Sequence, residues 1–169
     1  NLYGKVMAED THVIVMRENH PLAQSTISVT DYLAEDHIII SGGGDKDSPI
    51  DHALSSVNKK RKVFAKVPFF QAAMELLVKT DSILTTPLHI AANYSHYYDI
   101  KVKPLPINMD PHKYYILWHA KHHHDQEHKW FRELCLTQCQ IHLNETINLG
   151  MHENVPGEPV IITKAFVQD

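Results

Sequence analysis

Two segments combine small polar, aromatic and proline residues in a way that suits ligand binding. They are residues 67–71 (VPFFQ) and residues 84–87 (LTTP), and in both the pattern predicts a strand that passes into a helix. Ligands of α/β sheets bind where strands end beside helix N-termini, because backbone N–H groups are unpaired there. The two junctions therefore predict a seat for an anion or a carboxylate at one end of a sheet.

A histidine cluster offers a second kind of chemistry. The chain has 14 histidines, and five of them lie close together in sequence: His119, His122, His123, His124 and His128. His124 and His128 are four residues apart, which places them on one face of a helix as a usable metal pair. A His-Glu-x-x-His arrangement is lacking, so the favoured interpretation is a solvated helix entry that binds no metal.

Cys135 and Cys139 are also four residues apart, and His142 lies on the same predicted helical face. Zinc would need a fourth ligand from elsewhere in the chain, so buried thiols are the favoured interpretation. Two cysteines are too few for a disulfide framework, which favours a reducing, cytoplasmic setting.

The composition is that of a folded globular region. The chain has 169 residues, is 43% hydrophobic and 21% charged, and carries a formal net charge of −4 at pH 7. These values exclude collagen, a disordered tail and a disulfide scaffold. They disfavour non-specific binding of nucleic acid, which needs clustered cations. No apolar run approaches the ~18 residues of a membrane span, and the first residues show no secretory signal.

The sequence shows no pattern typical of an enzyme. A nucleophile elbow is missing, and the histidines are too numerous for a Ser-His-Asp set to be chosen among them. We therefore expect neither enzymatic activity nor a cofactor.

Predicted strands and helices alternate along the chain. The strands cover residues 11–17, 37–41, 63–67, 82–86, 100–105 and 114–119. The helices cover residues 50–57, 29–34, 69–79, 87–95 and 125–150, with Ser48 capping the first of these and Gly150 stopping the last. A run of cations at residues 59–62 follows the helix at 50–57 and is expected to be solvated. Such alternation predicts an α/β fold with a largely parallel sheet.

Five motifs, in the same order and spacing, resemble the effector-binding domain of LysR-type transcriptional regulators. The first is residues 16–23 (MRENHPLA), and the second is the strand at 37–41 with the helix start at 50–54. The third is residues 67–87 (VPFFQAAMELLVKTDSILTTP), and the fourth is the Leu-Pro pair at 105–106. The fifth is matched at Tyr115, Leu117, Trp118, His119, Asp125, His128, Trp130 and Arg132. The resemblance covers about residues 3–139.

The resemblance implies a type 2 periplasmic-binding-protein-like fold, in which two α/β lobes joined by two crossover strands hold an effector in the cleft between them. Residues 18–104 would form the complete second lobe, and residues 1–17 and 105–139 part of the first. Residues 140–169 have no counterpart and are unassigned. The helix-turn-helix and the opening strands of the first lobe are missing, so the chain resembles a C-terminal fragment that does not itself bind DNA.

The resemblance places seven residues in the effector cleft: Ser41, Gly42, Phe69, Phe70, Gln71, Thr85 and Thr86. One of the two phenylalanines is expected to pack inward and the other to face the cleft, and the sequence does not say which. The two threonines act either as a helix cap alone or as a cap and a ligand contact. The glycines at 42–44 lack the Lys-Ser/Thr ending of a phosphate loop and are interpreted as a mobile turn.

The resemblance also implies partners. A small metabolite, a carboxylate or an aromatic acid, occupies the cleft and shifts the equilibrium between two lobe arrangements. The parent protein forms a homodimer or homotetramer through the helix at 50–57 and binds DNA only through its helix-turn-helix domain, with no membrane partner. Two alternatives stay open: a stand-alone solute-binding protein of the same fold, and a metal-binding protein built on the histidine cluster.

Overall fold

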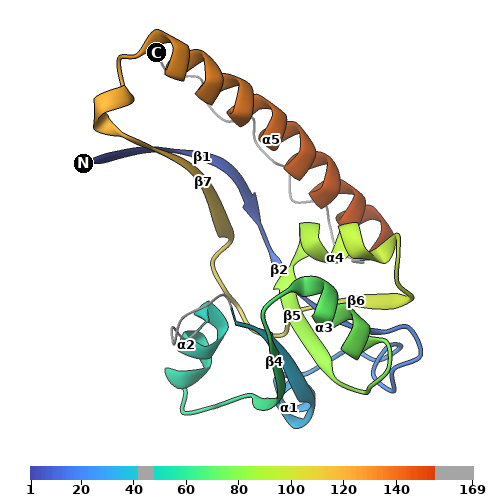
Figure 1. The fold of residues 1–169 in the computed structure, drawn as a ribbon. Helices are drawn as coiled ribbons and strands as arrows, with labels where there is room; N and C mark the ends of the chain where they lie inside the picture. The colour runs from blue at the N-terminus through green and yellow to red at the C-terminus, as the bar shows by residue number, and fades with distance from the viewer. Residues whose placement is uncertain (42–47, 155–169) are drawn as a thin grey trace.

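The computed structural model describes residues 1–41 and 48–154, whose strands form two sheets (Figure 1). The larger sheet has the strand order β4-β3-β5-β2-β6, and the smaller one pairs β1 with β7. The bounds of the strands are β1 Leu2–Asp10, β2 His12–Arg17, β3 Asp36–Ile40, β4 Lys62–Val67, β5 Ile83–Pro87, β6 Ile100–Pro104 and β7 His112–His119. Each strand expected from the sequence is present, and β1 is an additional one.

The five-stranded sheet is mixed. β3 is parallel to β4 and β5, whereas β2 is antiparallel to β5 and β6. The expectation of a largely parallel sheet is therefore wrong for two of the four strand pairs. The expectation came from the alternation of strands and helices, which does not fix the direction of β2. A strand covered on both faces carries an unbroken apolar run, here Val13–Met16, in either kind of sheet.

The helices are α1 Val29–Ala34, α2 Pro49–Ser55, α3 Phe70–Leu77, α4 Leu88–Ser95 and α5 Gln126–Asn154, with a short 3₁₀ turn at Ala120–His122. Ser48 caps α2 as expected, since its hydroxyl accepts a hydrogen bond from the N–H of Asp51 at 3.2 Å. α2 ends at Ser55, before the predicted position 57, and the chain then turns through Asn58 at φ 54°. Within the described ranges, no helix has the length and apolarity needed to span a bilayer.

Two hydrophobic cores lie on opposite faces of the five-stranded sheet. Val13 and Val15 of β2 join the core formed with α3, α4 and the last turns of α5. Ile14 and Met16 point to the other core, which is formed with α1 and α2. The alternation follows from the two-residue period of a strand. β2 therefore holds the two layers of helices together.

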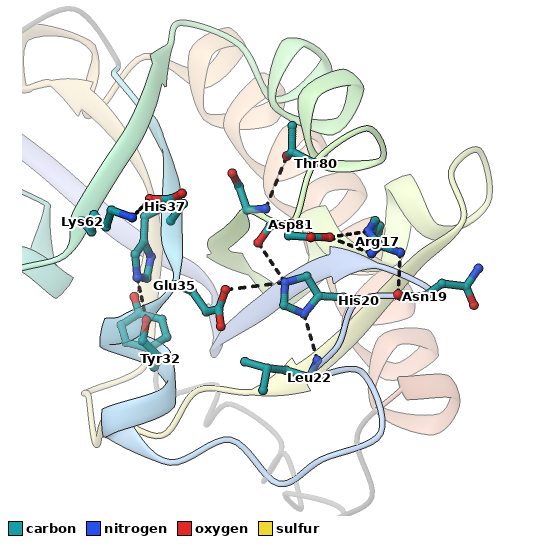
Figure 2. Close-up of polar contacts among 12 residues, drawn as sticks. Arg17, Asn19, His20, Leu22, Tyr32, Glu35, His37, Lys62, Thr80 and Asp81 are labelled. Atoms are coloured by element: carbon teal, nitrogen blue, oxygen red, sulfur yellow. Dashed lines mark hydrogen bonds and ion pairs between the residues drawn. The ribbon is translucent and has the colours of Figure 1, made fainter.

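The motif at residues 16–23 makes polar contacts with Asp81 at one end of this sheet (Figure 2). The guanidinium of Arg17 lies 2.7 Å from the carboxylate of Asp81. His20 is buried; its Nδ1 accepts the N–H of Leu22 at 3.1 Å, so its Nε2–H donates to the carbonyl oxygen of Asp81 at 2.9 Å. Two of the motifs that carry the resemblance are thus in direct contact, although more than sixty residues separate them.

The β1–β7 ribbon and α5 form the second part of the structure (Figure 1). The ribbon runs away from the five-stranded sheet, and α5 returns alongside it to pack against α4. Strand pairing places β2 in the five-stranded sheet, whereas residues 1–17 were expected in the first lobe. The division of the chain into lobes stays a prediction.

Gly150 does not end the last helix, as the sequence had suggested. α5 continues to Asn154, and Gly150 lies against α4. A Cβ atom at this position would lie 2.9 Å from Cδ1 of Leu88 and 3.0 Å from Cβ of Ala92. Glycine is therefore required here for close helix packing, because Leu88 is fully buried and Ala92 has no side chain that can rotate away.

We expect Gly150→Val to lower the free energy of unfolding by about 1–3 kcal/mol, because the added methyl groups overpack the α4–α5 contact. The matched control is Leu149→Val, since Leu149 is half exposed on the same helix; it should cost less than about 1 kcal/mol. Urea unfolding of both variants gives the comparison. Equal losses would show that α5 does not pack closely on α4 at this point.

Candidate functional site

A cleft of about 440 Å³ lies where the five-stranded sheet meets the β1–β7 ribbon. Its lining residues come from β2, β3, β5, α2, α3, α4 and β7, and also include Arg61, which precedes β4. The polar part of the lining includes Arg61, Thr85, Tyr114, His12, His89 and His112. The apolar part includes Ile39, Ile40, Ile50, Phe70, Pro87 and Ile90.

The structure brings only some of the predicted site residues to this cleft. Phe70 and Thr85 line it. Phe69 is the N-cap residue of α3 and is 70% exposed, away from the lining, and Gln71 is exposed beside it. Of the two phenylalanines, Phe70 is thus the one at the cleft, and neither is fully buried. Their part in binding stays a prediction.

Thr86 and Ser41 are not among the lining residues of the cleft. Thr86 is buried on the opposite face of β5 from Thr85, and it does not cap α4, whose N-cap residue is Pro87. Ser41 directly follows β3 and donates its N–H to the carbonyl oxygen of Val67 at 2.9 Å. Gly42 is outside the described residues.

Thr85 is held in place by a buried tyrosine. The hydroxyl groups of Thr85 and Tyr32 are 2.8 Å apart, and burial raises the pKa of Tyr32. The carbonyl oxygen of Tyr32 in turn accepts a hydrogen bond from Nε2 of His37 at 2.8 Å (Figure 2). Burial lowers the pKa of His37 to about 4, so its ring is neutral at pH 7. These contacts fix the Thr85 side chain at the edge of the cleft.

Arg61 is the one arginine or lysine in the described lining of the cleft, and its environment differs from the one expected. It was expected in a solvated run of cations, but its side chain is only 3% exposed. Its Nε and Nη2 donate to the two carboxylate oxygens of Asp51 at 2.9 and 2.7 Å, and Nη2 also reaches Ser48 Oγ at 3.0 Å. Burial would raise the pKa of Asp51, but the hydrogen bonds from Arg61 and Ser48 outweigh it, and the pKa is lowered.

Aromatic and histidine side chains from β2, α4 and β7 form the opposite wall. The rings of His12 and His112 meet edge to face at 5.7 Å, and those of His112 and Tyr114 at 4.7 Å. Nδ1 of His89 lies 2.6 Å from Oδ2 of Asp10, which is buried behind the cleft. Burial lowers the pKa of His12, the positive charge of His112 lowers it further, and Asp10 opposes both. Burial and Asp10 raise the pKa of Tyr114 to about 12.

The histidine cluster at residues 119–128 has a structural role in the described part of the chain. Arg132 lies over the ring of Trp118 at 4.6 Å and donates to the carbonyl oxygen of His122 and to Nδ1 of His128. His124 stacks edge to face on His123. Among the side chains that the structure describes, those of residues 1–41 and 48–150, no three His, Cys, Asp or Glu residues are arranged to hold a metal ion.

The two cysteines differ from expectation as well. Cys135 is half buried on α5, whereas Cys139 is exposed, so the prediction of buried thiols is wrong for Cys139.

A second hollow, of about 450 Å³, lies beside the end of α2 and includes Val57, Lys59 and Ile107. It contains none of the predicted site residues, so the cleft is the better candidate site.

A model of the LysR substrate binding domain matches residues 1–140. The chain belongs to this family. It is 23% identical over 132 residues to the HTH-type transcriptional activator NahR of Pseudomonas putida, a match that covers 78% of this chain and 44% of NahR. The chain therefore spans less than half the length of this relative.

Solved structures agree with the family. A transcriptional regulator of Vibrio parahaemolyticus is 26% identical, with a TM-score of 0.73, and the match covers 85% of this chain and 67% of that one. The effector-binding domain of QuiR in complex with shikimate has a TM-score of 0.57 at 20% identity, over 90% of this chain and 67% of its own. The fold is that of LysR effector-binding domains, the type 2 periplasmic-binding-protein-like fold expected from the sequence.

We expect Asp51→Asn to lower the free energy of unfolding of the LysR domain by about 3 kcal/mol, because Arg61 would stay buried without a countercharge. The matched control is Asp36→Asn, since Asp36 pairs with the exposed Lys62 at 2.9 Å; it should cost less than about 1 kcal/mol. Urea unfolding at pH 7 measures both.

The same pair predicts a pH dependence. The pKa of Asp51 is lower in the folded protein than in the unfolded chain, where it is about 4. The Asp51–Arg61 pair therefore stabilises the protein above about pH 4, and this stabilisation is lost as the pH falls further. The difference in stability between the wild-type chain and Asp51→Asn should therefore narrow below about pH 4. A difference that stays constant down to pH 2 would contradict the assignment.

Proposed function

We propose that the chain is the effector-sensing region of a bacterial LysR-type DNA-binding transcriptional regulator. The single observation that carries the proposal is the position of the cleft: it lies between the five-stranded sheet and the ribbon that crosses away from it, and Phe70 and Thr85 line it. A site between two units can respond to a ligand by changing their relative arrangement. Family membership and the shikimate complex of QuiR support a small-molecule effector.

The two parts of the structure correspond, in this proposal, to the two lobes. The five-stranded sheet with α1 to α4 is the second lobe, and it includes β2 from the segment first assigned to the other lobe. The β1–β7 ribbon and α5 belong to the first lobe. Exposed apolar side chains along the ribbon, among them Leu2, Tyr115 and Leu117, support a larger first lobe in the whole regulator, whose other strands cover them.

Family membership supports the proposed partners. In the whole regulator a helix-turn-helix domain binds DNA, and the protein assembles as a homodimer or homotetramer. Effector binding alters transcription by favouring one arrangement of the lobes, which requires different affinities for the two arrangements. The cleft is proposed to bind its ligand without catalysing a reaction.

A thermal-shift screen of the complete effector region against small carboxylates, aromatic acids and amino acids tests the proposal. A ligand at 100 times its dissociation constant should add about 2.7 kcal/mol of stability. Phe70→Ala and Thr85→Val should reduce this gain, each measured from its own unliganded baseline. Phe69→Ala is the matched control, because Phe69 is the neighbouring residue outside the cleft. Equal losses in Phe69→Ala and Phe70→Ala would contradict the assignment of the cleft.

A further inference from the structure

The end of α5 connects the two parts of the structure, the sheet part with α1 to α4 and the ribbon part with β1 and β7. The family model matches residues 1–140, whereas α5 continues to Asn154. Residues 141–150 of this helix, here called the brace, lie against α4 (Figure 1). The start of α5 lies beside the ribbon, so one helix contacts both parts.

Aromatic and polar contacts attach the start of α5 to the ribbon. The guanidinium of Arg132 lies 4.6 Å from the centre of the Trp118 ring in β7. It also donates hydrogen bonds to the carbonyl oxygens of His122 and His123, at 2.9 and 3.2 Å. The ring of His123 stacks on the ring of Tyr3 in β1, with 3.9 Å between their centres. Both strands of the ribbon are therefore tied to this end of the helix.

The brace packs closely against α4 at the other end. Ile147 is 1% exposed and belongs to the same core as Leu88 and Ala91. A Cβ atom at Gly150 would lie 3.0 Å from Cβ of Ala92, so the two helices are in contact at this point. Closely packed helices have discrete arrangements, and one cannot move past the other without a change of packing.

α4 also borders the cleft and the first crossover. His89 and Ile90 line the cleft, whereas Leu88 and Ala92 face the brace. The carboxylate of Asp10, the last residue of β1, accepts a hydrogen bond from the backbone N–H of His89 at 3.2 Å. A change in the contact between α4 and the brace therefore reaches an element that lines the cleft.

The two parts are joined through the backbone by Thr11, between β1 and β2, and by residues 105–111, between β6 and β7. Such short segments can turn through a few backbone dihedral angles. α5 has 29 residues and contains no proline, the commonest cause of a sharp kink, and it spans about 43 Å. A rotation of one part about the crossovers therefore moves the brace across α4 rather than bending α5.

We propose that the brace fixes the relative arrangement of the two parts, so that a movement about the crossovers requires the contact between α4 and α5 to shift or break. The inference goes beyond the proposed function, because it applies whether or not the cleft binds a ligand. It gives residues 141–150, for which the sequence predicted no role, control over how easily the cleft opens and closes.

The distance between two spin labels, one on each part, tests the inference in the full-length regulator. The labels are attached at Lys79→Cys, just after α3, and at Lys121→Cys, just beyond β7, because both lysines are exposed. Cys135→Ser and Cys139→Ser remove the natural thiols. Labelled subunits are diluted with unlabelled ones, so pulsed electron paramagnetic resonance reads distances within one subunit. The intact brace should give one narrow distribution of distances.

Ile147→Ala should broaden this distribution or add a second distance, because the brace loses its buried contact with α4. The matched control is Ile83→Ala, since Ile83 is equally buried but lies in the core on the other face of the sheet; its distribution should stay narrow. If either alanine variant fails to fold, Ile147→Val and Ile83→Val give the same comparison with a smaller expected change.

An unchanged distribution in the Ile147 variant, or equal broadening in the Ile147 and Ile83 variants, would overturn the inference. The measurement uses no ligand, so this result is independent of whether the cleft binds an effector.

Discussion

The burial of β2 on both faces is the constraint on which the rest of the structure depends. Its central residues separate the two hydrophobic cores, and its ends perform different tasks. Arg17 at one end forms an ion pair with Asp81, and His12 at the other end lines the cleft. Because an antiparallel partner lies on each side of β2, a shift of its register would expose both cores and displace the cleft residues together.

The sequence was informative where local pattern decides the structure. Alternation, the Ser48 cap and the two strand-to-helix junctions located the main elements, and the junctions led to Phe70 and Thr85. It was less informative about strand direction, because a strand covered on both faces reads the same in parallel and antiparallel sheets. The end of α5 was also predicted wrongly, because a glycine is typical of a helix end, whereas Gly150 allows close packing between α5 and α4.

The polar half of the cleft could not be located from local pattern. Arg61 stands in a run of cations that resembles any solvated helix end, and only the fold places it against Asp51. His12 comes from β2, and His112 and Tyr114 come from β7, so they are distant in sequence and meet only at the edge of the cleft. With fourteen histidines in the chain, composition drew attention to the 119–128 cluster, in which the carbonyl oxygen of His122 and the ring of His128 accept hydrogen bonds from Arg132.

Hydrogen exchange with and without a saturating ligand from the thermal-shift screen tests most directly whether the cleft beside Phe70 and Thr85 is the effector site. We expect slower exchange of backbone amides at the start of α3, at the end of β5 and around His112. Protection confined to the hollow beside Val57, Lys59 and Ile107, with no change at β5, would contradict it.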